Sequence, residues 1–282
     1  PSLGNDKNLI IRYIEKPAET LEEEFTEALA SGSGPDLVIL PQDKLWENKS
    51  KLVPIPYGSV SERDFRATFV EEGELFLSKS GIYALPITID PLVLYYNRDI
   101  LSSAGLAKPI AYWDEIYSAA LQLNKKDDAG NLTRSAAALG ETRNVNHFKE
   151  ILTLLMLQAG SPITGFFGPD LRSEILSASD STIPAETALN FYTQFSNPTK
   201  PFYSWNRTLN PADTHFVSGD LAYYLGFVSE LKTLRAKSPT LNFAVSSVPQ
   251  SRVSGKNITF GKVYGVAISR GTKSPSAALS AA

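Results

Sequence analysis

The segment 82–99 constrains the fold most, because it combines a buried-strand pattern with two prolines. Residues 92–96 form an unbroken run of apolar and aromatic side chains, which favours a β-strand. A run without alternation predicts a strand buried on both faces, as in a parallel or mixed α/β sheet. Pro86 and Pro91 precede this run, and proline lacks the N–H that a central strand donates. We therefore expect a crossing segment between two bodies of structure, with Asp90 where they meet.

The chain length indicates two lobes, because 282 residues are many for one hydrophobic core. We expect an N-terminal lobe from residues 1–91 and 261–282, and a C-terminal lobe from residues 92–260. The net charge of -3 predicts no basic surface for nucleic acid or an anionic membrane. No apolar run approaches the ~20 residues that span a bilayer. The absence of cysteine excludes disulfides and zinc–thiolate sites.

The N-terminal third continues an α/β pattern. Residues 9–11 predict a short strand, and residues 18–30 place apolar side chains at helical spacing opposite a face of glutamates. Residues 36–40 predict a buried strand, and Asp43 lies in the loop that follows it. Ligands bind at this end of the strands in open α/β sheets, so Asp43 is a candidate contact. The alternative is a turn aspartate that caps the next segment.

Two loops in the second half carry polar candidates. Asn146 lies where a helix is expected to begin, so its side chain could bind a polar ligand or cap a helix. Trp205 and Asn206 lie in a segment with neither helical nor strand periodicity. A tryptophan beside an asparagine suits a sugar, because the ring covers an apolar sugar face and the amide bonds hydroxyls. A tryptophan packed at the surface is the alternative.

Three further candidates accompany predicted strands. Residues 221–225 form an apolar strand that ends at Gly226 and Phe227. A glycine lets the backbone come close to a ligand, and Phe227 could offer an apolar ring face. Tyr264, in the last predicted strand at residues 262–269, could offer another.

Short motifs spread over almost the whole chain have the order found in one known family. They are ALASG (28–32), GPDLV (34–38), YALP (83–86), LYYNRD (94–99), WDE (113–115), GVAIS (265–269), and Phe216 with Gly219 and Ala222. Together they resemble the extracellular solute-binding proteins of ABC importers, the family that includes maltose-binding protein. The resemblance implies an α/β, two-lobed type II periplasmic-binding fold that closes over its ligand at a hinge.

The resemblance also assigns roles and shows departures. It places Asp90 at an acidic ligand-contacting position and Asp43 at a sugar-contacting carboxylate. The family's first strand and helix would precede Leu9, and its last helices would follow Ala282, so the N-terminal lobe is expected to be incomplete. Tyr112 stands where the family usually has threonine or serine as a helix cap.

The expected function is that of a carrier without enzymatic activity or a cofactor. It would bind a small polar solute, a mono- or oligosaccharide, in the cleft between the lobes, act as a monomer and serve an ABC permease. The expected location is periplasmic or extracellular, with membrane anchoring through a removed lipoprotein signal. Two alternatives remain: a glycoside-processing enzyme that pairs Asp43 with Asp90, or a carrier for a cationic solute such as a polyamine. With only His147 and His215 in the chain, a three-histidine metal site is impossible.

Overall fold

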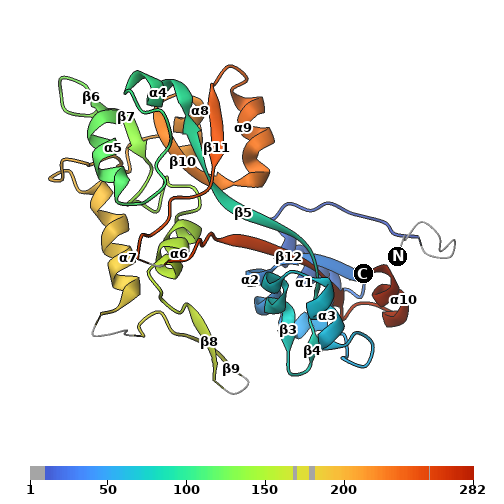
Figure 1. Cartoon of the computed structure of the whole chain (residues 1–282). Helices are drawn as coiled ribbons and strands as arrows, with labels where there is room; N and C mark the ends of the chain where they lie inside the picture. Colours follow the sequence, from blue (N-terminus) through green and yellow to red (C-terminus); the bar gives the residue numbers. More distant parts are fainter. Residues whose placement is uncertain (1–9, 168–169, 178–181, 254) are drawn as a thin grey trace. The chain divides into compact units, whose positions relative to one another are not determined.

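The chain folds into two compact units. The computed structural model describes residues 10–167, 170–177, 182–253 and 255–282 (Figure 1). One unit comprises Pro1–Ile89 with Lys262–Ala282, and the other comprises Asp90–Gly261. The chain changes unit inside two strands, β5 (Leu85–Asn97) and β12 (Gly261–Ser269). Asp90 is therefore the first residue of the second unit, whereas we expected it near the end of the first.

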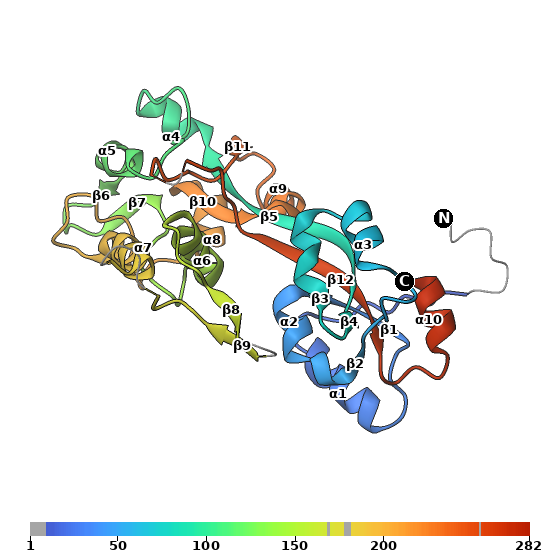
Figure 2. The same ribbon diagram turned by 60° about the horizontal axis from the view of Figure 1, so that its bottom comes forward.

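The first unit is built on the antiparallel pair of β1 (Leu37–Pro41) and β12, with Leu37 opposite Ile268 and Pro41 opposite Tyr264. The strand β2 (Leu52–Val53) also pairs with β12. The remaining elements are α1 (Leu21–Ala30), α2 (Gln42–Glu47), η2 (Lys49–Lys51), α3 (Glu62–Thr68), η3 (Glu71–Phe76), α10 (Pro275–Ala281) and the pair β3 (Leu77–Ser78) and β4 (Gly81–Ile82). Figure 2 shows β3 and β4 near α3.

Two predicted elements fall at the start of this unit, a helix and a short strand. The amphipathic helix predicted over residues 18–30 is confirmed as α1, and its Phe25 is buried. The strand predicted at residues 9–11 is wrong for Ile10 and Ile11, which have no regular structure and are exposed. Leu9 lies outside the described residues. A strand needs a hydrogen-bonded neighbour, and no described strand pairs with this segment.

The second unit centres on β10 (Leu221–Phe227), which is antiparallel to β5 and parallel to β7 (Leu132–Ala137). Its outer strands are β11 (Phe243–Ser246), paired with β5, and β6 (Lys125–Lys126), paired with β7. The helices are α4 (Arg98–Ser103), α5 (Glu115–Leu123), α6 (Phe148–Gln158), α7 (Pro184–Thr193), η4 (Gln194–Ser196), α8 (Ala212–Val217), η5 (Val228–Glu230) and α9 (Leu231–Lys237). Helices α5 and α9 flank these strands (Figure 1), and β8 (Thr164–Phe167) with β9 (Asp170–Ser173) forms a separate hairpin.

The prolines do not interrupt β5, which runs through both of them. The ladder with β10 begins only after Pro91, where Leu92 lies opposite Phe227 and Tyr96 opposite Tyr223. The missing proline N–H groups therefore remove no hydrogen bond from the pairing with β10 and β11, because both prolines lie outside the part of β5 that pairs with these strands.

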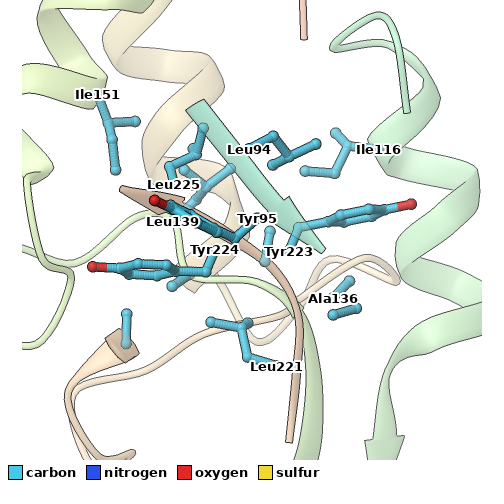
Figure 3. Packing of buried hydrophobic residues seen from close by; sticks show 14 of the residues in the cluster. Leu94, Tyr95, Ile116, Ala136, Leu139, Ile151, Leu221, Tyr223, Tyr224 and Leu225 are labelled. Atoms are coloured by element: carbon cyan, nitrogen blue, oxygen red, sulfur yellow. The ribbon is translucent and has the colours of Figure 1, made fainter. Parts of the chain in front are cut away.

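The core of the second unit surrounds β10, in which every residue is buried. Adjacent side chains point to opposite faces, as Tyr223 and Tyr224 do in Figure 3. Tyr95 of β5 packs beside Tyr224, with ring centroids 6.0 Å apart, and its hydroxyl donates to the Phe227 carbonyl at 2.7 Å. This bond fixes the end of β10. None of the helices in the described ranges is long and apolar enough to cross a membrane.

Candidate functional site

A carboxylate that sequence reasoning missed organises the end of β10. Glu230, the last residue of η5, accepts hydrogen bonds from the Tyr224 hydroxyl and from the Phe227 N–H, each at 2.6 Å. Gly226 is required here, because a Cβ at this position would come within 2.5 Å of Tyr224 Cε1 and 2.9 Å of Glu230 Oε1. The glycine therefore admits these two side chains. The sequence carried no signal for this arrangement, because it showed only a glycine at a strand end.

His147 completes the arrangement. Its Nε2 lies 2.7 Å from Glu230 Oε1, and its ring meets the Phe227 ring edge-on with centroids 4.9 Å apart. Its backbone is left-handed, with φ of 60° and ψ of 27°, immediately before α6. Such a conformation costs a residue other than glycine about 1–2 kcal/mol. Surrounding contacts must hold it, and such positions cluster at functional sites.

The charge on Glu230 is held by its donors. Burial raises the pKa of Glu230, but hydrogen bonds from His147 and Tyr224 outweigh burial and leave the pKa below the usual value for glutamate. Burial, reinforced by the Glu230 charge, raises the pKa of the Tyr224 hydroxyl. Glu230 is therefore an anion at neutral pH, and Tyr224 is a neutral donor to it.

Asp90, the candidate from the crossing segment, lies beside this turn. Its Oδ1 accepts from the Ser229 N–H at 3.0 Å, and its side chain is half-buried. Within the part of the chain that the structure describes, Ser229 is the one hydrogen-bond donor to this carboxylate. Asp90 therefore combines a held orientation with an oxygen, Oδ2, that can accept from a solute.

Asn146 has a structural role in the neighbouring loop. Its Oδ1 accepts from the Asp213 N–H at 3.1 Å in the first turn of α8. Pro211 precedes α8 and has no side-chain oxygen for this purpose, so Asn146 supplies it from another segment. Burial raises the pKa of Asp213, but the hydrogen bond from Lys237 and others outweigh it, and the net pKa is low.

Four residues of the second unit that were predicted to contact a ligand are buried, hydrogen-bonded or closely packed within the protein. Trp205 has no exposed surface, so the expectation that its ring covers a sugar is contradicted. The Asn206 amide donates to the Tyr203 hydroxyl, and its oxygen accepts from Thr208. Phe227 is 3% exposed and offers no open ring face, while Gly226 admits Tyr224 and Glu230 instead of a ligand. For Trp205 and Phe227 the physical reason is the same, because both rings belong to the buried core of this unit.

In the first unit, Asp43 and Tyr264 lie near one end of the β1–β12 pair. Pro41 pairs with Tyr264, and Asp43 follows two residues later in the first turn of α2. Gln42 Oε1 accepts from the Val263 N–H at 2.6 Å, which ties the start of α2 to β12. Both Asp43 and Tyr264 are half-buried. No group of three acidic or histidine side chains among the described residues could hold a metal ion.

Known proteins share this architecture. A family model described as bacterial extracellular solute-binding protein matches residues 7–281. A cyclo/maltodextrin-binding protein complexed with maltotetraose gives a TM-score of 0.70 at 20% identity, covering 95% of this chain and 64% of that one. An ABC transporter solute-binding protein from Thermotoga lettingae, bound with α-D-tagatose, gives 0.68 at 19% identity, covering 93% and 65%.

A protein of Brucella abortus (strain 2308), named as a binding protein, is 29% identical over 124 residues, which are 43% of this chain and 29% of that protein. The chain thus spans less than two thirds of the length of each of these relatives. The solved structures confirm the predicted α/β, two-lobed fold class.

Proposed function

This chain belongs to the family of bacterial extracellular solute-binding proteins, and on that premise we propose that it captures a saccharide for an ABC importer. The match over residues 7–281 carries the proposal, because it includes nearly the whole chain. The kind of solute is supported by structural relatives that hold maltotetraose, tagatose or mannotriose. The proposed location is outside the cytoplasmic membrane, where a permease would receive the loaded protein.

We assign the acceptor roles to two carboxylates, one in each unit. Asp43 and Asp90 are half-buried aspartates, and ionised carboxylates make strong hydrogen bonds to hydroxyl donors. Tyr264, near Asp43, supplies an aromatic face for the apolar side of a sugar ring. The amide nitrogen of Asn146 supplies a donor, since its oxygen is already bonded to Asp213. Trp205, Asn206, Gly226 and Phe227 are left out because their groups are buried or engaged.

Binding without catalysis is the role we propose. The relatives in the comparison are named as binding proteins. A glycosidase would need one of its two carboxyls to stay protonated as a general acid. Asp90 accepts a backbone N–H with Oδ1, and its other oxygen can accept a hydrogen bond from a solute hydroxyl. We therefore assign it the role of an acceptor.

Calorimetry on the 282-residue chain tests the proposal. The titrants are maltotetraose, mannotriose and tagatose, and spermidine tests the alternative of a cationic solute. Hydrolysis of nitrophenyl glycosides, followed by absorbance, tests the alternative of a glycoside-processing enzyme. We expect saccharide binding that weakens at least tenfold in Asp90→Asn and in Asp43→Asn. The asparagine at residue 90 keeps an oxygen for Ser229 and removes only the charge. Asp128→Asn, on an exposed turn, is the matched control and should bind as the parent does. Binding of spermidine alone, or turnover of a glycoside, would overturn the assignment.

A further inference from the structure

We infer that Glu230 is a positioning residue, which acts through the turn at residues 227–230 to hold the Asp90 carboxylate in place. The inference rests on the proposed function, in which Asp90 contacts the solute. It starts from three groups that converge on one carboxylate: the Tyr224 hydroxyl and the Phe227 N–H each donate to Glu230 at 2.6 Å, and His147 Nε2 lies 2.7 Å from its Oε1. These groups come from the middle of β10, from its end, and from the loop before α6.

The turn that Glu230 closes carries the contact to Asp90. Glu230 bonds the N–H of Phe227, three residues earlier, so the backbone between them has little freedom. Ser229 lies inside that turn, and its N–H donates to Asp90 Oδ1 at 3.0 Å. The Tyr95 hydroxyl bonds the Phe227 carbonyl and holds the turn from β5. The direction of the Ser229 N–H, and with it the orientation of Asp90, therefore depends on Glu230.

His147 keeps an unfavourable left-handed backbone conformation at this site. Of the residues that the structure describes, it is the one other than glycine with positive φ. Its imidazole lies beside the Glu230 carboxylate and edge-on to the Phe227 ring. A glycine at residue 147 would adopt the same left-handed backbone without steric strain and would remove the imidazole from beside Glu230. A substitution at residue 147 can therefore test the positioning of Asp90 without straining the backbone.

The test combines His147→Gly and Glu230→Gln, with Glu186→Gln on the exposed side of α7 as the matched control. The readout that needs no solute is the amide shift of Ser229 in ¹H–¹⁵N spectra during an acid titration. In the parent chain this amide should follow the titration of Asp90, and Asp90→Asn should abolish the response. We expect the response to fall below about half in both variants and to persist in Glu186→Gln.

The second readout is the dissociation constant for the saccharide that the parent chain binds. We expect it to rise about tenfold in His147→Gly, with circular dichroism showing that the variant keeps its fold. A Ser229 amide that titrates as in the parent in both variants would overturn the inference, as would unchanged affinity in His147→Gly. If no saccharide binds the parent, the proposed function fails, whereas the amide titration still decides whether Glu230 holds Asp90.

Discussion

The indole Nε1 of Trp205 donates to Oδ1 of Asn144 at 3.0 Å, and both side chains are buried. The Asn144 amide nitrogen in turn donates to the carbonyls of Asn206 and Leu209, each at 2.9 Å. One asparagine thus ties the tryptophan and its loop to the start of the segment before α6. Trp205 belongs to the hydrophobic core of the second unit, and its one polar atom is bonded inside the protein.

We therefore expect Trp205→Phe and Asn144→Ala to affect stability and leave solute affinity within about twofold. Each buried polar group left without a partner costs about 1–3 kcal/mol. Asn144→Ala should lower the free energy of unfolding by about 3 kcal/mol, and Trp205→Phe by less. Urea denaturation followed by circular dichroism measures both. A tenfold loss of affinity in a folded Trp205→Phe variant would restore the tryptophan as a ligand contact.

Gly226 gives a prediction that rests on close packing. In Gly226→Ala the new methyl group would meet Tyr224 Cε1 at 2.5 Å and Glu230 Oε1 at 2.9 Å, so the turn must shift. Overpacking of this kind costs about 1–3 kcal/mol. Gly58→Ala is the matched control, because nothing lies within 4 Å of its added Cβ. Thermal unfolding should show a lower midpoint for the first variant only, and equal midpoints would mean that the turn has room.

The buried imidazole of His215 should make the folding stability depend on pH. Burial lowers the pKa of this imidazole, and nearby Asp220 offsets the effect only partly. Below the ordinary pKa of about 6.5, the unfolded chain therefore binds a proton that the folded chain refuses. Stability should be greatest above that pH and should fall as the pH drops toward the lowered pKa of the folded chain.

The variant His215→Phe tests this assignment. The ring lies edge-on to Trp205, with centroids 5.3 Å apart, and a phenyl group can keep that contact without titrating. Urea midpoints measured between pH 7 and pH 5 should decline less steeply in the variant than in the parent chain. An unchanged slope would show that His215 does not cause the pH dependence.

Glu230 should contribute to the loss of folding stability in acid, at a lower pH than His215. Its folded pKa is depressed, so its stabilising effect is complete above the ordinary glutamate value and is lost as the pH falls through the folded pKa. Glu230→Gln should therefore flatten the decline of the unfolding midpoint below about pH 4.5. A decline as steep as in the parent would show that other carboxylates carry the acid sensitivity.

Sequence patterns were informative where a structure depends on near neighbours in the chain. The unbroken apolar runs at residues 92–96 and 221–225 predict strands, and both lie in β5 and β10. Helical spacing likewise predicts α1, and the ordered motifs indicate the family that the comparison confirms. Periodicity records which face of a segment is buried, and that is settled within a few residues.

Contacts between distant segments had no such local signal. Trp205 and Asn144 are 61 positions apart, and nothing near Trp205 shows that its ring faces a core. Glu230 resembles any surface glutamate until β10, η5 and the loop before α6 come together around it. Residue types and spacing predicted the strands β5 and β10, the helix α1 and the family of this protein. Whether an aromatic ring or a carboxylate is buried, paired or open to a solute depends on packing between remote segments, because desolvation and hydrogen bonding act through space.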